Sequence, residues 1–328
     1  MDVTLVMALR DLLEPESVAI YRSVGEPGDE RWLTRAHLRA GDAVASADPL
    51  WAKPNALPKA ADHPLRLEAM RTRSVTQVAQ GGQWLYLFPI ATDRDVIGVI
   101  EILSTRRLGA GAQRMVSSVL RIYHNFQGLL DYSERDTLTG LLNRKTFDES
   151  FLKVLSEIPA RPHQPAEMGG DDRRHEAAVP HYVLGVIDID HFKTVNDGFG
   201  HLIGDEVLLL LSRLMRGSFR FHDLLYRFGG EEFVVLMRCD EEIHAGEAFE
   251  RLRLNTERYA FPQVGRITVS IGFTEVRPGD GPADAFERAD KAVYHAKGHG
   301  RNQVHNYAAL VASGVIKEAT QLSDVELF

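Results

Sequence analysis

The second half of the chain has the clearer alternation of apolar and polar positions. Apolar runs of strand length alternate there with longer segments whose apolar residues recur at helical spacing. The expected elements are a strand over Tyr182–Asp190, a helix over Phe192–Met215, strands over Leu224–Phe228 and Phe233–Met237, a helix near Glu241–Arg258, a half-buried strand over Arg266–Thr274 and a helix over Ala283–Lys297. Gly229 and Gly230 are expected to form a tight hairpin turn between the two middle strands. This βαββαβ order predicts an α+β domain whose antiparallel sheet is backed by helices, the ferredoxin-like arrangement.

The first 110 residues have a weaker pattern. Strand-like runs over Ser17–Val24, Gln83–Pro89 and Asp95–Leu103 are separated by stretches rich in turn-forming residues. Residues 1–110 are therefore expected to form a separate α+β domain.

A helix is expected from about Ala112 to Ser133, within a linker at residues 111–135. Its apolar residues recur three and four positions apart, at Val116, Val119, Tyr123, Phe126 and Leu130. This spacing is typical of a coiled-coil seam, along which two copies of the chain would pair. It fits equally an amphipathic helix that packs on its own domain, and both interpretations stay open.

Residues 159–180 are rich in proline, glycine and charged residues and contain almost no large apolar side chain. Such a segment buries too little apolar surface to offset the entropy of ordering, so a mobile insertion is expected. His163 and His175 within it lack the compact spacing of metal ligands and are interpreted as loop residues. A frayed tail is expected over residues 307–328.

Composition narrows the possible functions. The 328 residues, 44% of them hydrophobic, are enough for two packed domains. The net charge of -8 excludes a protein that coats nucleic acid, because that role requires a broad basic surface. The single cysteine, Cys239, permits no intrachain disulfide and fits a reducing cytoplasm. No basic, apolar leader opens the chain and no apolar run approaches the roughly 18 residues of a membrane span, so a cytoplasmic protein is expected.

Four carboxylates are expected to converge in the second domain. Asp188 and Asp190 end one buried strand, and Glu231 and Glu232 follow the hairpin turn on a neighbouring strand. Like charges gathered in one place oppose each other's ionisation unless a cation neutralises them. Mg²⁺ or Mn²⁺ would do so, because these hard cations prefer oxygen ligands.

Several segments resemble the GGDEF family of diguanylate cyclases. Gly229–Phe233 reads Gly-Gly-Glu-Glu-Phe, which is similar to the family signature in its GGEEF variant. Asp136–Arg144 resembles the opening segment of the family, Val186–Lys193 its first strand and Ala289–Lys297 its closing helix. Further matches stand at Asn196-Asp197, Gly200-His201, Gly204-Asp205 and Gly300-Arg301-Asn302. The resemblance identifies residues 136–306 as a palm-type catalytic domain.

The resemblance implies that the chain joins two GTP molecules into cyclic di-GMP and releases pyrophosphate. Asp188, the backbone carbonyl of Ile189 and Glu231 would hold two Mg²⁺ or Mn²⁺ ions. Glu231 or Glu232 would help to take the proton from the 3′-hydroxyl of one GTP. The GTP-binding residues that it implies are Lys193, Asn196, His201, Asp205, Gly229, Gly230, Lys297 and Arg301. A carboxylate at Asp205 suits the N–H donors of guanine and does not suit adenine.

Two forms of regulation follow from the same resemblance. Each site would hold one GTP, so the ring closes only in a homodimer, and the linker helix would set how the two catalytic domains meet. Arg220 and Asp223 resemble the RxxD site at which the family's product inhibits the enzyme. Arg251 would add a second contact in the other protomer.

The N-terminal domain looks like a GAF-type sensor, and a PAS-like domain stays open as the alternative. No motif for haem, flavin or bilin occurs in it, so its small-molecule or protein signal is unknown. Two rival functions remain for the second domain: an inactive receptor for cyclic di-GMP, and a cyclase that accepts adenine.

Overall fold

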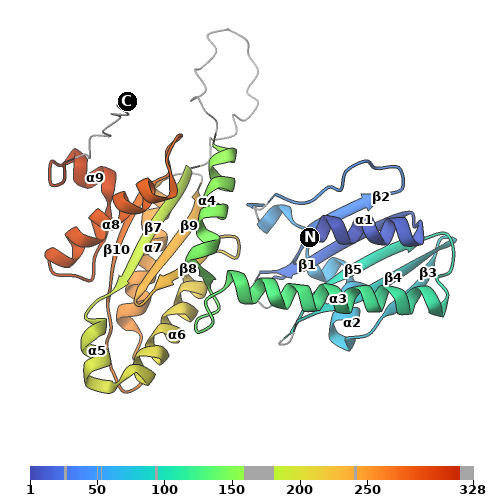
Figure 1. The fold of residues 1–328 in the computed structure, drawn as a ribbon, viewed down its shortest axis with the longest axis horizontal. Helices are drawn as coiled ribbons and strands as arrows, with labels where there is room; N and C mark the ends of the chain where they lie inside the picture. The colour runs from blue at the N-terminus through green and yellow to red at the C-terminus, as the bar shows by residue number, and fades with distance from the viewer. Residues whose placement is uncertain are drawn as a thin grey trace, which may run out of the picture. The chain divides into compact units, whose positions relative to one another are not determined.

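A computed structural model describes residues 1–25, 28–49, 51–52, 54–92, 95–158, 181–239 and 242–317. The predicted insertion at 159–180 and the tail beyond residue 317 lie outside these described residues. The start of the predicted tail is not frayed, because Tyr307–Ala312 forms a helix whose Tyr307 and Leu310 are buried against Ala292. The chain divides into two units, Met1–Ser133 and Glu134–Phe328 (Figure 1). No helix within the described ranges has the length and apolar character needed to cross a membrane.

A five-stranded antiparallel sheet in the order β2-β1-β5-β4-β3 forms the centre of the N-terminal unit. Its strands are β1 (Ser17–Val24), β2 (Arg31–Arg39), β3 (Thr76–Gln80), β4 (Gln83–Ala91) and β5 (Val96–Ser104). The helices are α1 (Asp2–Leu13), α2 (Pro64–Thr72) and α3 (Ala110–Glu134), with 3-10 turns at Pro54–Ala56 and Ala60–Asp62. Leu9 of α1 and Val116 of α3 are buried on one face of the sheet with Ile20. Ala69 of α2 packs in a separate cluster with Trp32 on the other face.

The predicted strands over 17–24, 83–89 and 95–103 correspond to β1, β4 and β5, and the mixed α+β architecture is confirmed. The sequence pattern did not predict α1, β2, α2 or β3. The helix expected at 112–133 is α3. Some of its apolar residues pack on their own domain, and others are exposed. Val116 and Tyr123 are buried within their own unit, whereas Phe126 is 50% exposed and Leu129 is 67% exposed.

A six-stranded sheet in the order β11-β10-β7-β9-β8-β6 forms the C-terminal unit. Its strands are β6 (Leu142–Asn143), β7 (His181–Ile189), β8 (Leu224–Gly229), β9 (Glu232–Cys239), β10 (Val269–Glu275) and β11 (Val304–Asn306). The helices are α4 (Arg144–Glu157), α5 (Phe192–Phe199), α6 (His201–Ser218), α7 (Glu242–Arg258), α8 (Pro282–Gly298) and α9 (Tyr307–Ala312). The four central strands pair antiparallel as predicted, but the edge strands β6 and β11 pair parallel to their neighbours.

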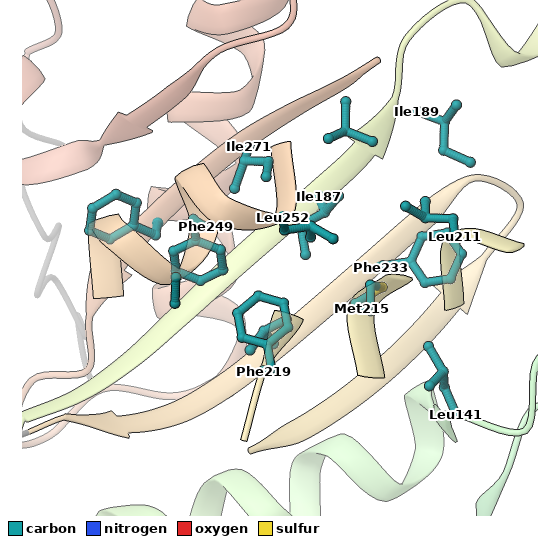
Figure 2. Packing of buried hydrophobic residues seen from close by; sticks show 14 of the residues in the cluster. Leu141, Ile187, Ile189, Leu211, Met215, Phe219, Phe233, Phe249, Leu252 and Ile271 are labelled. Carbon is teal, nitrogen blue, oxygen red and sulfur yellow. The ribbon is translucent and has the colours of Figure 1, made fainter. Parts of the chain in front are cut away.

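The main core of this unit lies between the sheet and helices α6 and α7. Figure 2 shows Ile187 and Phe233 from the strands meeting Leu211 and Met215 of α6 and Phe249 of α7. Helix α8 packs along β10 and β7 on the other face. Gly185 of β7 fits this core because a Cβ there would lie 2.1 Å from the Phe249 ring.

Three sequence-based predictions for this unit need correction. The helix expected at 192–215 is two helices, because Gly200 has a φ of 83° and separates α5 from α6. The hairpin turn consists of Gly230 and Glu231, since Gly229 still pairs with Glu232 at the end of β8. The strand expected to be half-buried, β10, is buried on both faces, because α7 lies on one side and α8 on the other.

Candidate active site

Two carboxylates face each other across adjacent strands of the C-terminal sheet. Asp188 on β7 lies directly opposite Glu232, the first residue of β9, and Glu231 precedes it in the turn. Side chains alternate between the two faces of a strand, and the neighbours Ile187 and Phe233 point into the core (Figure 2). Asp188 and Glu232 therefore share the opposite face, on which α8 packs.

Burial and like charges raise the pKa of all three carboxyl groups. Burial is the main cause at Asp188, which is 6% exposed, and the ion pair with Lys297 opposes the rise. Burial also comes first in raising the pKa of Glu231 and Glu232, followed by the negative charge of Asp188. Such a group of carboxylates favours a bound cation, which would relieve the mutual repulsion.

Lys297 supplies a positive charge from the end of α8. Its Nζ lies 2.8 Å from Asp188 Oδ2. Helix α8 is held close to the sheet at Gly272 of β10, where a Cβ would lie 2.1 Å from the backbone oxygen of Ala289. Only glycine permits this close approach, and the approach brings the Lys297 side chain within reach of Asp188.

The donor set fits a hard divalent cation. Asp188 Oδ1 is buried and has no hydrogen-bond partner, so one carboxylate oxygen is available as a ligand. Glu231 and Glu232 are only partly buried and supply further oxygens beside it. Within the described part of the chain, no three His, Cys, Asp or Glu side chains are already arranged as a metal-binding group. The carboxylates would therefore have to close around an ion when it binds.

Asp190 does not join the other carboxylates, contrary to the prediction that all four converge. Its Oδ1 accepts a hydrogen bond from Ser270 Oγ at 2.7 Å. Its Oδ2 accepts bonds from Thr268 Oγ1 at 2.7 Å and from the backbone N–H of Asn302 at 3.0 Å. Asp190 thus ties the end of β7 to β10 and to the segment after α8. The sequence shows two carboxylates at a strand end but not these donors, which lie far away along the chain.

The residues predicted to read guanine lie on the two helices that follow β7. Asn196 of α5 packs against Gly204 of α6, where a Cβ would lie 2.0 Å from Asn196 Oδ1. Lys193, His201 and Asp205 have exposed positions on the same two helices. Because α5 starts where β7 ends, these side chains are carried at the end of the sheet at which Asp188 lies.

Arg301, Gly229 and Gly230 all have positive backbone φ angles. Arg301 has a φ of 63°, and its N–H donates to the carbonyl of Ala296 at 2.9 Å. Gly229 and Gly230 have φ values of 145° and 52°. A Cβ at either glycine would meet no described atom within 4 Å, so this side of the turn is open to a ligand.

The position of the hairpin turn is fixed by an arginine that the sequence did not single out. Arg227 of β8 donates from Nε and Nη2 to the carbonyl oxygen of Gly230 at 3.2 and 2.9 Å. Its Nη1 also donates to both carboxylate oxygens of Asp136, at 3.1 and 3.2 Å. Asp136 in turn accepts bonds from the N–H and the hydroxyl of Thr139. Asp136 and Arg227 lie 91 positions apart, so no local motif reveals the pair.

Two further charged residues lie near Glu232 and were not predicted. Asp290 of α8 helps to raise the pKa of Glu232, after burial and Asp188, whereas Arg144 of α4 opposes that rise. The Arg144 guanidinium also lies 5.5 Å from the centre of the Phe228 ring. Both residues lie in segments that resemble the family, and this resemblance is the sequence signal that could have identified them.

The predicted inhibitory residues gather around one small pocket. Arg220, Asp223 and Arg251 all line a pocket of ≈ 120 Å³ within a single chain. Asp223 is 7% exposed and accepts a bond from the backbone N–H of Arg220 at 2.8 Å. Burial, opposed by Arg220, raises the pKa of Asp223 to about 6. Arg251 donates twice to the carbonyl of Ser218, at 3.0 and 2.6 Å. Arg251 thus lines the same pocket as the other two residues of its own chain, and its contact in the other protomer stays a prediction.

Residues 172–303 match the family described as "Diguanylate cyclase, GGDEF domain". The diguanylate cyclase DgcP of Pseudomonas aeruginosa is 40% identical over 172 residues, which are 52% of this chain and 23% of that protein. The response regulator PleD of Caulobacter vibrioides is 36% identical over 192 residues, which are 57% of this chain and 38% of that protein. A solved GGDEF domain of DgcB from Caulobacter crescentus, in complex with c-di-GMP, is 30% identical, with a TM-score of 0.46 over 53% of this chain and 96% of that one. The chain thus spans well under half the length of these two curated relatives.

Proposed function

We propose that this chain, which carries a GGDEF domain of the diguanylate cyclase family at residues 172–303, condenses two GTP molecules into cyclic di-GMP and two pyrophosphates. The observation that carries this proposal is the carboxylate pair Asp188 and Glu232, with Glu231 beside it and Lys297 bonded to Asp188. The raised pKa values of these carboxyl groups are typical of a site that handles cations and protons.

The proposed chemistry assigns a role to each acidic side chain. Asp188, the backbone carbonyl of Ile189 and Glu231 would hold two Mg²⁺ or Mn²⁺ ions, which activate the attacking oxygen and stabilise the leaving one. Glu231 and Glu232 are partly exposed, and a carboxylate with a raised pKa accepts a proton more readily than an ordinary one. Either is therefore suited to take the proton from the 3′-hydroxyl of GTP.

The binding residues divide by the part of GTP that they contact. Asn196 would donate and accept hydrogen bonds at the guanine edge and the Asp205 carboxylate would accept them, with His201 nearby on α6. The phosphates would be bound by three cationic side chains, those of Lys193, Lys297 and Arg301. Gly229 and Gly230, which carry no side chains at the start of the turn, would let the nucleotide approach the backbone.

Catalysis requires two copies of the chain, since each GGDEF domain would bind one GTP. Helix α3 offers a surface for this pairing. Ile122, Phe126 and Leu129 recur at spacings of four and three residues, and each is at least half exposed. We propose that this stripe pairs with its copy and sets how the two catalytic domains meet.

The pocket at Arg220, Asp223 and Arg251 is the proposed site of product inhibition. Its two guanidinium groups suit the phosphates of cyclic di-GMP, and the Asp223 carboxylate suits the N–H donors of guanine. A larger pocket of ≈ 420 Å³ also includes Arg220 and Asp223, together with Arg135 and Arg216. Arg220 and Asp223 therefore line both pockets.

Residues 1–110 are proposed to form the sensor domain, of GAF or PAS type. One of its contacts with the linker helix is a buried hydrogen bond of 2.5 Å from Tyr123 of α3 to Asp2 of α1. Arg35 of β2 pairs with the other oxygen of Asp2 at 2.8 Å. A signal that moves α1 or β2 would thus act directly on α3.

The cyclase is tested by incubating the purified chain with GTP and Mg²⁺ and separating the nucleotides by chromatography. The variant is the double substitution Glu231→Ala and Glu232→Ala. Its matched control is Glu149→Ala, which removes an exposed carboxylate from α4. We expect cyclic di-GMP and pyrophosphate from the unmodified chain and from the control, and none from the double variant.

The outcomes separate the cyclase from its rivals. Product formation by the double variant would refute the assigned carboxylate site. If the unmodified chain forms no product yet binds labelled cyclic di-GMP, and stays inactive when its α3 helices are fused to a dimeric coiled coil, the receptor function replaces the cyclase. Conversion of ATP in place of GTP would refute the role of Asp205.

A further inference from the structure

Three histidines gather where α8 ends, away from any role in the proposed cyclase. His295 lies on α8 and His299 caps its C-terminus four residues later. The centres of their rings are 3.8 Å apart. His305 of β11 brings a third ring to 4.8 Å from that of His295. Two histidines at positions i and i+4 project from the same side of a helix, so both can reach one ligand.

The hydrogen bonds leave ring nitrogens available as metal ligands. His299 Nδ1 lies 2.8 Å from the carbonyl oxygen of His295, so it carries the proton and leaves Nε2 with a free lone pair. His305 Nε2 lies 2.7 Å from Gln303 Oε1, which likewise leaves Nδ1 free. The orientation of Gln303 is fixed, because its Nε2 donates to the carbonyl of His299 at 2.6 Å. Histidines that bind metals are usually oriented in this way by a carbonyl acceptor on the other nitrogen.

The rings are held close to the spacing that an ion requires. A tetrahedral zinc ion with Zn–N bonds of about 2.0–2.1 Å sets two ligating imidazole centres roughly 5 Å apart. The observed separations are 3.8 Å for the stacked rings of His295 and His299 and 4.8 Å for the edge-on rings of His295 and His305. In the described residues the three rings do not converge on one point, so the side chains would have to turn until their nitrogens meet at the ion. His299 is exposed, and His295 and His305 are only partly buried, so little packing opposes the rotation.

The ligand type limits the class of metal. A neutral imidazole nitrogen is the ligating species. Nitrogen ligands favour Zn²⁺, Ni²⁺ and Cu²⁺ over Mg²⁺, which prefers oxygen.

We propose that His295, His299 and His305 bind one transition-metal ion of the Zn²⁺ class, at a site separate from the carboxylates. In the sequence, the three histidines flank two of the proposed phosphate-binding residues. Lys297 lies between His295 and His299, and Arg301 lies between His299 and His305. Metal binding would hold this segment in place. Resting on the proposed function, we further expect Zn²⁺ to change the KM for GTP.

The test is a calorimetric titration of the full-length chain with Zn²⁺ at pH 7.5, in excess Mg²⁺ so that the carboxylates are occupied. Because the chain has 13 histidines, each variant is compared with His244→Ala, which removes an exposed histidine from α7. We expect the double substitution His295→Ala and His299→Ala to remove one equivalent of bound Zn²⁺. Gln303→Leu, which removes the acceptor for His305, is expected to weaken binding about 10- to 100-fold.

Two results would overturn the site. The first is an unchanged stoichiometry and affinity in the double variant. The second is a Cu²⁺ electron paramagnetic resonance spectrum of the double variant that shows the same histidine nitrogen couplings as that of the control. Both measurements record metal binding without GTP, so they do not depend on cyclase activity. If the chain proves inactive but the double variant still binds one Zn²⁺ fewer than the control, the proposed metal site stands and only the proposed function fails. A KM for GTP that Zn²⁺ leaves unchanged would overturn only the link to nucleotide binding.

Discussion

Replacing Asp136 by asparagine tests whether the bond to Arg227 positions the hairpin turn that carries Glu231, the proposed catalytic residue. Asp136→Asn keeps the size of the side chain and removes the charge that Arg227 faces. The two side chains are 22% and 13% exposed, so the pair is neither a surface pair nor fully buried. Surface pairs contribute about 0.2–1 kcal/mol, and removing one partner of a buried pair costs about 3–5 kcal/mol. We expect the free energy of unfolding to fall by about 2 kcal/mol.

The effect on catalysis follows from the bonds to Gly230. Arg227 without its partner holds the turn less firmly, and a shift of about 1 Å in a reacting group costs roughly a hundredfold in rate. We expect the kcat for cyclic di-GMP formation to fall about 10- to 100-fold while the KM for GTP changes little. Steady-state kinetics and thermal denaturation measure the two effects separately.

A matched ion pair elsewhere in the same unit provides the control. Asp280 and Arg288 form two hydrogen bonds of 2.9 and 2.6 Å and are more deeply buried, with side chains 5% and 11% exposed. Asp280→Asn should therefore destabilise the chain at least as much as Asp136→Asn but leave kcat nearly unchanged. Equal losses of kcat in both variants, or an unchanged kcat in Asp136→Asn, would refute the positioning role.

The pH dependence of stability gives an independent check on the same pair. Burial raises the pKa of Asp136, but hydrogen bonds from Thr139 and Arg227 outweigh this and lower it below its ordinary value of 3.8. A carboxyl group with a lowered folded-state pKa stabilises the protein above the unfolded-state pKa, and this contribution disappears as the pH falls through the folded-state value. The difference in stability between the unmodified chain and Asp136→Asn should therefore be constant near neutral pH and shrink below pH 3.8.

Three other changes have defined outcomes. Gly272→Ala places a Cβ 2.1 Å from the backbone of α8, so we expect a loss of about 1–3 kcal/mol in stability and weaker GTP binding, measured by denaturation and by fluorescent-GTP titration. Because the pKa of Asp223 is raised to about 6, its carboxylate is lost below that pH, and the cyclic di-GMP concentration for half-maximal inhibition should rise as the pH falls through 6. Asp223→Asn should remove that pH dependence. Tyr123→Phe removes the buried bond to Asp2 and should lower the melting temperature of the N-terminal unit without changing the affinity for GTP, as calorimetry and nucleotide titration would show.

Local patterns in the sequence predicted most elements that have strong periodicity. The strands β7, β8, β9 and β10 were expected because their apolar runs are long and end at turn-forming residues. Helix α2 and strand β3 were not, since their residues are largely exposed and leave no periodic apolar signal. The break between α5 and α6 depends on the positive φ of Gly200, which the spacing of apolar residues does not encode.

The candidate site divides in a similar way. Asp188, Glu231 and Glu232 could be predicted, because they lie within short motifs at strand ends. The separate role of Asp190 could not, since its partners Ser270 on β10 and Thr268 just before β10 lie about 80 positions away along the chain. Contacts between distant segments are set by the packed fold and not by local sequence.

The pair of Asp136 and Arg227 joins the segment after α3 to the hairpin turn before β9. Asp136 follows the last residue of α3, Glu134, by two positions, and Arg227 joins it to the turn that carries Glu231. We propose that a rotation or shift at the end of α3 reaches this turn through the ion pair. The pair would thus give the proposed sensor signal a short route to the proposed active site. Directional hydrogen bonds transmit a change in orientation, whereas an apolar contact would tolerate it.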